Sequence, residues 1–206
     1  MSRVSCKQIN HYAIDKIFLV CYNYSITLKS KGKLMEKQIK YVQLIADNDE
    51  LCKTFELLMY DYIDEMNKHS HRPLPKQFQK KWIDSIIAMQ GPADRHLEIC
   101  YIENNPIGFL YGKIDHADHR GFIKSGFGYI MEFYVKPEYR RQGYATRMLC
   151  RLEGLFQKDG AKMMYLTADP VTGRPFWEAM GFKNTGEQLP ENQLDIYERE
   201  ILLYNN

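Results

Sequence analysis

The stretch YIMEFYVKPEYRRQGYAT, residues 129–146, decides the fold of this chain. Residues 129–135 are β-formers around a single glutamate and predict a strand. The residues from Thr146 to about Lys158 predict an amphipathic helix, and a short polar turn separates the two elements. The first N–H groups of a helix have no intrahelical acceptor and carry partial positive charge. The turn therefore favours an anion, typically a phosphate.

Small and basic residues fill this turn. Gly143 allows a positive φ or a close approach of the backbone to a ligand, and Ala145 is too small to block that approach. Arg140 and Arg141 add two permanent cations whose geometry matches phosphate. We expect the backbone N–H groups from Gln142 to Ala145 to do most of the binding, with the arginines in a secondary role.

Three phrases of the sequence resemble those of one protein family. Arg140-x-x-Gly143-x-Ala145 resembles the signature of the GNAT superfamily of N-acetyltransferases, in which this loop holds the pyrophosphate of acetyl-CoA. Residues 135–139, VKPEY, and residues 175–182, PFWEAMGF, resemble the phrases that come before and after it in the family. The phrases stand in the family's order, and the resemblance extends from about Met35 to the C-terminus.

The resemblance implies a donor and the residues that bind it. The donor is acetyl-CoA, used as a co-substrate, and no metal is implied. Its pantetheine arm would pair with the exposed backbone edge of the strand at Phe133, Tyr134 and Val135. The residues implied in binding the rest of the donor are Arg140, Arg141, Gln142, Gly143, Tyr144, Ala145 and Thr146, and Trp177 is a further candidate for contact with the cofactor arm.

Periodicity and turn residues divide the chain from residue 39 onward into strands and helices. Strands are expected at 39–45, 97–102, 107–114, 127–135, 163–167, from 182, and at 194–203. Helices are expected at 50–67, 76–89, 146–158 and 174–180. Such alternation predicts an α/β (α+β) domain with a mixed sheet. The resemblance implies three layers, with a mostly antiparallel central sheet and helices on both faces.

One domain is the natural expectation for 206 residues. We assign residues 35–206 to the acetyltransferase-like domain and residues 1–34 to an N-terminal extension. The extension has three interpretations: an added edge strand, a poorly ordered tail, or a segment upstream of a true start at Met35. In each case we expect it to be peripheral to function.

Composition argues against several other classes of protein. The net charge of +2 gives no case for nucleic acid or a membrane surface, and the apolar run at 17–22 is too short to span a bilayer. The five cysteines form no C-x-x-C pair and are odd in number, which indicates reduced thiols in a cytoplasmic protein. The sequence contains neither a Walker pattern nor a G-x-G-x-x-G after a strand, so nucleoside triphosphate and dinucleotide sites are excluded.

Glu132 is the candidate general base. It stands alone among apolar residues in the expected central strand. Burial of a carboxylate is costly and raises its pKa, which suits a group that removes a proton from an amine. The family's base is often a Glu in this region of the strand. The alternative, to which we give equal weight, is that Glu132 pairs with a lysine or arginine where the sheet opens.

Trp177 departs from the family pattern, which often has a tyrosine here to protonate the departing thiolate. The indole N–H is too weak an acid for that role, although Trp177 can still pack against the cofactor arm. The thiolate would then take its proton from water or from a nearby group, with Tyr165 and Tyr134 as unranked candidates.

Other polar residues have more ordinary interpretations. The spacing of Asp115, His116, Asp118 and His119 suggests a metal site, but no further Cys or His cluster completes it. We therefore interpret these four residues as solvated residues of a loop. Three acidic residues share one face of the helix expected at 50–67, namely Asp61, Asp64 and Glu65. We interpret this face as solvent-exposed, and the alternative is that it attracts a cationic amine to the acceptor site. Asp169 is a secondary candidate for contact with substrate or cofactor.

These observations predict an N-acetyltransferase that moves an acetyl group from acetyl-CoA to a primary amine by direct transfer in a ternary complex. A small-molecule acceptor is favoured over a protein. The alternative is a module of the same fold that binds acyl-CoA without catalysis. The sequence leaves the acceptor's identity open, and we expect a homodimer because many relatives in the family dimerise. Neither nucleic acid nor a membrane is expected as a partner.

Overall fold

The computed structural model describes residues 37–70, 72–118, 123–171, 173–189 and 193–202. Contacts within the chain separate Met1–Glu36 from Lys37–Asn206. The extension expected at residues 1–34 lies outside the described residues. Among the residues described, no helix is both long enough and apolar enough to cross a membrane.

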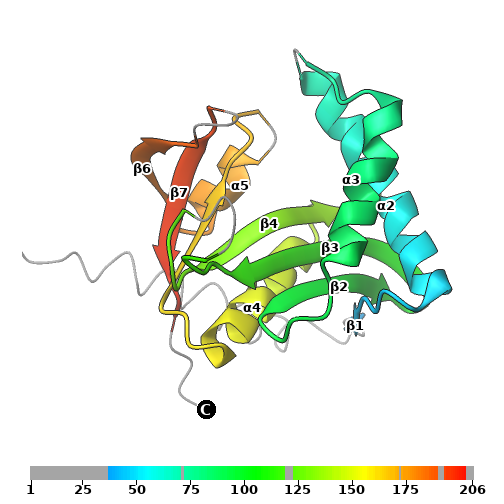
Figure 1. Ribbon diagram of the computed structural model, residues 1–206, viewed down its shortest axis with the longest axis horizontal. Helices are drawn as coiled ribbons and strands as arrows, with labels where there is room; N and C mark the ends of the chain where they lie inside the picture. The colour runs from blue at the N-terminus through cyan, green and yellow to red at the C-terminus, as the bar shows by residue number, and fades with distance from the viewer. Residues whose placement is uncertain (1–36, 71, 119–122, 172, 190–192, 203–206) are drawn as a thin grey trace, which may run out of the picture. The chain divides into compact units, whose positions relative to one another are not determined.

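A seven-stranded sheet forms the centre of the domain, in the order β1-β2-β3-β4-β5-β7-β6 (Figure 1). All pairs of neighbouring strands are antiparallel except β4 and β5, which are parallel. The sheet is therefore mixed and mostly antiparallel, as predicted. Its strands are β1 (Ile39–Gln43), β2 (Arg95–Ile102), β3 (Asn105–Ile114), β4 (Gly128–Val135), β5 (Met163–Thr167), β6 (Lys183–Gln188) and β7 (Asp195–Glu200).

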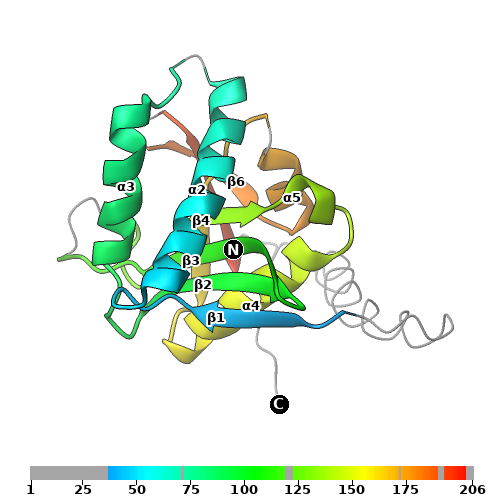
Figure 2. The ribbon, with the colours of Figure 1, turned by 90° about the vertical axis from the view of Figure 1, so that its right-hand side faces the viewer.

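Helices cover both faces of this sheet, which confirms the predicted three layers (Figures 1 and 2). Two helices pack on one face of β2 and β3, and a third packs on the opposite face. The first two are α2 (Asp49–His69) and α3 (Lys76–Ala88), and the third is α4 (Tyr144–Lys158). A 3-10 turn, η1 (Pro137–Tyr139), and a short helix, α5 (Arg174–Ala179), complete the domain.

The helix α2 begins at a side-chain cap and buries one stripe of residues. Asn48 accepts a hydrogen bond from the N–H of Leu51 at 3.0 Å, which satisfies one of the donors at the helix start. The fully buried positions are Phe55, Leu58, Met59 and Ile63. Tyr62 and Met66 lie at the partly buried margin of this stripe. That margin leaves the Tyr62 side chain free to reach the sheet.

The helix α4 lies close to the sheet because glycines face it. A Cβ on Gly128 would lie 2.3 Å from the ring of Phe156, and a Cβ on Gly112 would lie 2.5 Å from the same ring. These two glycines lie on neighbouring strands, two residues apart in register, since Gly112 pairs with Ile130 and Gly128 with Ile114. Because neither glycine has a side chain, the Phe156 ring can pack directly on the sheet, and α4 lies correspondingly close to it.

A bulge in β4 changes which side chains face α2. Tyr111 pairs with Glu132 but Gly112 pairs with Ile130, so Met131 is the extra residue. Ile130 therefore belongs to the core on the α4 side, whereas Met131 packs on the opposite side with α2 and α3. Glu132 is opposite Tyr111, whose side chain lies in that second core, so Glu132 also faces α2.

The strands β4 and β5 separate soon after they begin. Their pairing comprises Gly128 with Met164 and Tyr129 with Tyr165. Beyond this point, within the described part of the chain, residues 132–135 have no strand partner on the β5 side. We call residues 132–135 the open edge of β4.

Candidate active site

The open edge of β4 presents backbone groups of alternate residues. The N–H of Lys136 donates to the C=O of Ile107 on β3 at 2.8 Å. Because antiparallel pairing alternates, Tyr134 also turns its backbone groups toward β3, whereas Phe133 and Val135 turn theirs to the open side. Of the three residues expected to hold an extended ligand by their backbone, two have the right orientation.

The turn after β4 has the conformation that an anion site requires. Gly143 has φ +80° and stands at the N-cap of α4, and Arg141 has φ +60°. The N–H of Arg147 donates to the C=O of Gly143 at 3.2 Å, which starts the hydrogen-bond ladder of α4. The N–H groups of Tyr144, Ala145 and Thr146 therefore precede the ladder and remain available to a ligand. We call residues 140–146 the phosphate turn.

Arg140 makes contacts that the sequence did not indicate. Its Nη1 and Nη2 donate to Glu65 on α2 at 2.8 and 2.6 Å, and its Nε donates to the C=O of Val135 at 2.8 Å. Its guanidinium also lies 5.8 Å from the centre of the Tyr134 ring. Glu65 was expected to face solvent or to attract an amine, and this ion pair corrects the first expectation. Asp64 of the same helix is exposed, as expected.

Glu132 lies between β4 and α2 with a tyrosine as its partner. The hydroxyl of Tyr62 donates to Glu132 Oε2 at 2.8 Å. Burial raises the pKa of Glu132 to about 7, against a smaller opposing effect of the Tyr62 hydrogen bond. The alternative of a lysine or arginine partner is not realised among the described residues. A carboxyl group that titrates near neutrality is suited to accept a proton from an amine.

Asp169 follows β5 and contributes negative charge near Tyr62. The pKa of Tyr62 is raised well above its usual value, first by burial, then by Glu132, and also by Asp169. The backbone C=O of Asp169 accepts from the N–H groups of Gly173 and Arg174 at 3.2 and 2.9 Å, which fixes the loop before α5. The loop therefore holds Asp169 where its charge acts on Tyr62, the hydrogen-bond partner of Glu132.

Trp177 packs in a cluster of aromatic side chains and is not suited to act as a general acid. Its ring centre is 5.3 Å from Phe133, 4.9 Å from Phe176 and 5.4 Å from Phe182, and 8% of the residue is exposed. Phe133 belongs to the open edge, so Trp177 supports that edge from the side of α5. Its indole offers no acidic proton to a thiolate.

The two tyrosines considered as acids are also poorly suited. Burial raises the pKa of Tyr134 to about 12, which makes its hydroxyl a weak proton donor at neutral pH. The hydroxyl of Tyr165 already donates to Asp115 Oδ2 at 2.8 Å, and burial with that carboxylate raises its pKa further. Neither tyrosine is therefore placed to protonate a leaving group.

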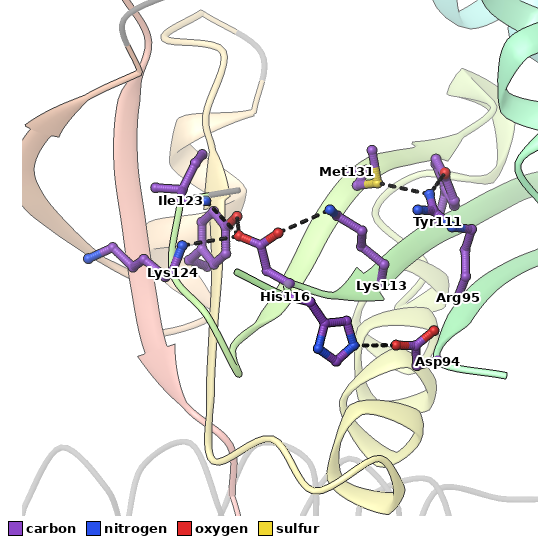
Figure 3. Close-up of polar contacts among 10 residues, drawn as sticks. Asp94, Arg95, Tyr111, Lys113, His116, Ile123, Lys124 and Met131 are labelled. Carbon is purple, nitrogen blue, oxygen red and sulfur yellow. Dashed lines mark hydrogen bonds and ion pairs between the residues drawn. The ribbon is translucent and has the colours of Figure 1, made fainter. Parts of the chain in front are cut away.

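Asp115 is buried, which corrects the expectation of a solvated loop residue. Its carboxylate accepts from the N–H groups of Ile123 and Lys124 at 2.7 and 3.1 Å and lies 3.0 Å from Lys113 Nζ (Figure 3). Although burial alone would raise it, these hydrogen bonds hold the pKa of Asp115 below its ordinary value. The network ties the end of β3 to the start of β4 and to β5.

His116 contributes a separate contact. Its Nε2 lies 2.5 Å from Asp94 Oδ2, and both side chains are partly exposed (Figure 3). His119 lies outside the described residues. Within the described ranges, no three His, Cys, Asp or Glu residues converge as metal ligands. The contacts of Asp115 and His116 therefore account for these polar residues as parts of a structural hydrogen-bond network.

Comparisons with known proteins identify a family and a fold. The model of the acetyltransferase (GNAT) family matches residues 57–182. A search of curated proteins found no match. Among solved structures, the PaiA N-acetyltransferase of Thermoplasma acidophilum in complex with coenzyme A is similar, with TM-score 0.60 and 17% identity over 79% of this chain and 99% of that chain.

Two further structures share the fold. An acetyltransferase of the GNAT family from Staphylococcus aureus Mu50 matches with TM-score 0.62 and 11% identity, over 80% of this chain and 100% of that chain. An aminoglycoside 6'-N-acetyltransferase complexed with coenzyme A matches with TM-score 0.59 and 12% identity, over 81% of this chain and 99% of that chain. At these identities the structural matches show the fold, whereas the family model matches more than half of the sequence.

Proposed function

This chain belongs to the GNAT family of acetyltransferases, and we propose that it transfers an acetyl group from acetyl-CoA to the primary amine of a small molecule. Membership of the family makes the protein an acyltransferase. The observation that carries the finer proposal is the position of Glu132. Glu132 lies on β4, whose open edge leads into the phosphate turn, and its carboxylate accepts a hydrogen bond from the hydroxyl of Tyr62.

The described residues fit a ligand with a pyrophosphate and an extended amide arm. The N–H groups of Tyr144, Ala145 and Thr146 and the positive φ of Gly143 suit the pyrophosphate. The open-edge N–H and C=O of Phe133 and the N–H of Val135 suit the amide arm, which would add to β4 as another strand does, whereas the C=O of Val135 already accepts from Arg140. Bound there, acetyl-CoA supplies an activated thioester beside Glu132.

Glu132 would start the reaction by accepting a proton from the ammonium form of the acceptor, directly or through a water. The neutral amine then attacks the thioester carbonyl, a C–N bond forms, the C–S bond breaks, and the nitrogen passes its second proton to water. Backbone N–H groups on the open edge stabilise the negative charge that develops on the carbonyl oxygen. The thiolate takes a proton from water, because Trp177, Tyr134 and Tyr165 are unsuited to donate one.

The surroundings of Glu132 favour a slender acceptor. The Glu132 side chain is partly buried and contacts the hydroxyl of Tyr62, whose ring packs on Phe109 and Tyr134 at 5.9 and 5.6 Å between ring centres. An amine at the end of a narrow chain can reach such a group more easily than an amine on a folded protein surface. Asp169 adds negative charge, which favours a cationic acceptor over a neutral one.

Calorimetry with acetyl-CoA, followed by turnover of a panel of diamines, aminoglycosides and lysine peptides, tests the proposal. We expect acetyl-CoA to bind and at least one small amine to be acetylated. Glu132→Gln should lower the rate by about 100-fold with unchanged CoA affinity, because it removes the base and keeps the shape. Glu103→Gln is the matched control, since Glu103 is exposed in the turn between β2 and β3.

Two results would count against this assignment. Exclusive turnover of lysine peptides would reject the small-molecule acceptor and keep the acetyltransferase. Equal rates for Glu132→Gln and the native enzyme across the pH range would reject Glu132 as the base.

A further inference from the structure

Arg140 is the first residue of the phosphate turn, but its guanidinium is directed at α2. Both terminal nitrogens donate to the carboxylate of Glu65, at 2.8 and 2.6 Å, in a two-pronged ion pair. The third donor, Nε, holds the C=O of Val135 at the end of β4. The Arg140 and Glu65 side chains are 38% and 22% exposed, so the pair is partly shielded from solvent. Two parallel hydrogen bonds fix orientation as well as distance.

The pair lies one helical turn from the contact that holds the base. Tyr62 and Glu65 are three residues apart on α2, so their side chains leave the same face of the helix. Tyr62 holds Glu132 on β4, and Glu65 holds Arg140 just beyond the end of β4. One turn of α2 therefore contacts both the base and the residue that opens the phosphate turn.

We propose that Arg140 and Glu65 are positioning residues, which hold α2 against the phosphate turn and keep the base at a fixed distance from the donor. Arg140 acts through Glu65 and is not a ligand of the donor's phosphates. This inference rests on the proposed function of the same site.

Charge supports this division of roles. A carboxylate at 2.6 to 2.8 Å cancels most of the field of the guanidinium at the phosphate turn. A phosphate that recruited Arg140 would leave Glu65 close to a second anion, which is unfavourable. The backbone N–H groups of the turn offer an anion site without that conflict.

Geometry explains why such a pair would matter to the rate. Transfer requires the amine, the base and the thioester carbonyl to be aligned within a fraction of an ångström, and small misplacements are costly. The base lies on β4, but its carboxylate is held by Tyr62 of α2, whereas the donor is held by the backbone of β4 and by the turn. The Arg140–Glu65 pair joins these two supports directly.

A double-mutant cycle with CoA as the probe separates the two roles. We expect Arg140→Ala, Glu65→Ala and the double variant each to change the calorimetric Kd for CoA by less than about threefold. If Arg140 binds phosphate instead, Arg140→Ala should weaken CoA by about tenfold or more while Glu65→Ala leaves CoA affinity unchanged or tightens it. That second pattern would overturn the proposal.

Two further measurements, hydrogen exchange in α2 and steady-state kinetics, report on the positioning role directly. Amide hydrogen exchange in α2 should become faster by a similar factor in all three variants, because each removes the same tie. With 1,4-diaminobutane or an aminoglycoside as acceptor, kcat should fall by about tenfold in each variant while the KM for acetyl-CoA stays nearly constant. Additive losses in the double variant, or α2 exchange equal to that of the native protein, would refute the pairing.

Controls keep the outcome interpretable. Lys53→Ala removes an exposed ion pair with Glu56 on the same helix and should change none of the three readouts. The swapped pair Arg140→Glu with Glu65→Arg should recover part of the lost protection in α2. If no amine is acetylated by the native enzyme, the proposed acceptor class fails, whereas CoA affinity and hydrogen exchange still decide the role of Arg140.

Discussion

The hydroxyl of Tyr62 tunes the group that we assign as the base. Its hydrogen bond favours the ionised carboxylate of Glu132, so it keeps the pKa lower than burial alone would set it. We expect Tyr62→Phe to move the acidic limb of the kcat/KM profile upward by about 0.5 to 1 pH unit. The rate should fall several-fold at pH 7 and recover above pH 8.

Tyr60→Phe provides the control for this change. Tyr60 lies on the same helix near Glu56 and does not contact Glu132. Its pH profile should match that of the native enzyme. An unchanged limb in Tyr62→Phe would mean that the hydroxyl does not influence the ionisation that limits turnover.

Glu132 should also make the native state less stable at neutral pH than at mildly acidic pH. Its pKa is about 7 when folded and 4.5 in the reference state, so the folded protein binds the extra proton between these values. The contribution of Glu132 to stability is fully present below pH 4.5 and is lost as the pH rises to 7. Glu132→Gln removes this titration and keeps an acceptor for Tyr62.

We therefore expect Glu132→Gln to be more stable than the native protein at pH 8, by about 1 to 3 kcal/mol. The difference should shrink toward zero as the pH falls to 5. Thermal unfolding at several pH values measures it. A variant that is less stable than the native protein at pH 8 would contradict the raised pKa.

For single residues, the sequence indicated which side chains are candidates for function better than it indicated which side chains they contact. A lone carboxylate in an apolar strand marks Glu132 because burial of a charge needs a reason. The partner, Tyr62, lies 70 residues away on a helix, and no local pattern encodes which helix turn meets which strand residue. The Arg140–Glu65 pair was missed for the same reason, with 75 residues between its members.

At the scale of elements, the closeness of β3 to β4 depends on Gly108. A Cβ there would lie 2.1 Å from the C=O oxygen of Tyr134, a backbone atom that cannot rotate away. Gly108→Ala should therefore force the strands apart beside the open edge, at a cost of about 2 to 3 kcal/mol in the free energy of unfolding. Chemical denaturation measures this loss, and CoA affinity should fall with it.

Gly154 is the matched glycine for this comparison. It lies within α4, and a Cβ there would meet nothing within 4 Å. Gly154→Ala should stabilise the protein by about 0.5 to 1 kcal/mol through helix propensity and a less flexible unfolded chain. If both substitutions had the same effect, the close approach at Gly108 would not be what limits the packing of β3 on β4.

The bounds of most elements were predictable to within a few residues because hydrophobic periodicity and turn residues act locally. The expected strand at 163–167 matches β5, and the expected helix at 76–89 differs from α3 by one residue. The bulge at Met131 was not predictable, since register depends on which residues of β3 and β4 pair. That bulge is what turns Glu132 toward α2.

At the scale of the whole domain, the early separation of β4 from β5 raises the question of what joins the two parts of the sheet. A buried ion pair provides one connection. Glu153 on α4 lies 2.8 Å from Arg199 Nη2 on β7, and its other oxygen accepts from the N–H of Leu202 at 2.8 Å. Arg199 also donates to the C=O of Met180 at 2.7 Å. The position of β7 between β5 and β6 was not predicted, so neither was this contact.

Glu153→Gln tests how much this connection contributes. The glutamine keeps the shape and can still accept from Leu202, but it leaves the buried Arg199 cation without a counter-charge. Removal of one partner from a buried pair is expected to cost about 3 kcal/mol, or a fall in Tm of about 6 to 12 °C for a domain of this size. Scanning calorimetry measures the shift.

The same substitution at an exposed pair is the control for Glu153→Gln. Glu178 pairs with Arg174 one turn earlier on α5, and both side chains are about half exposed. Glu178→Gln should change the free energy of unfolding by less than about 0.5 kcal/mol, because solvent screens the pair. Equal losses at the two sites would show that the Arg199 cation reaches solvent when its partner is removed. The two parts of the sheet would then be held together by the apolar core beneath α4.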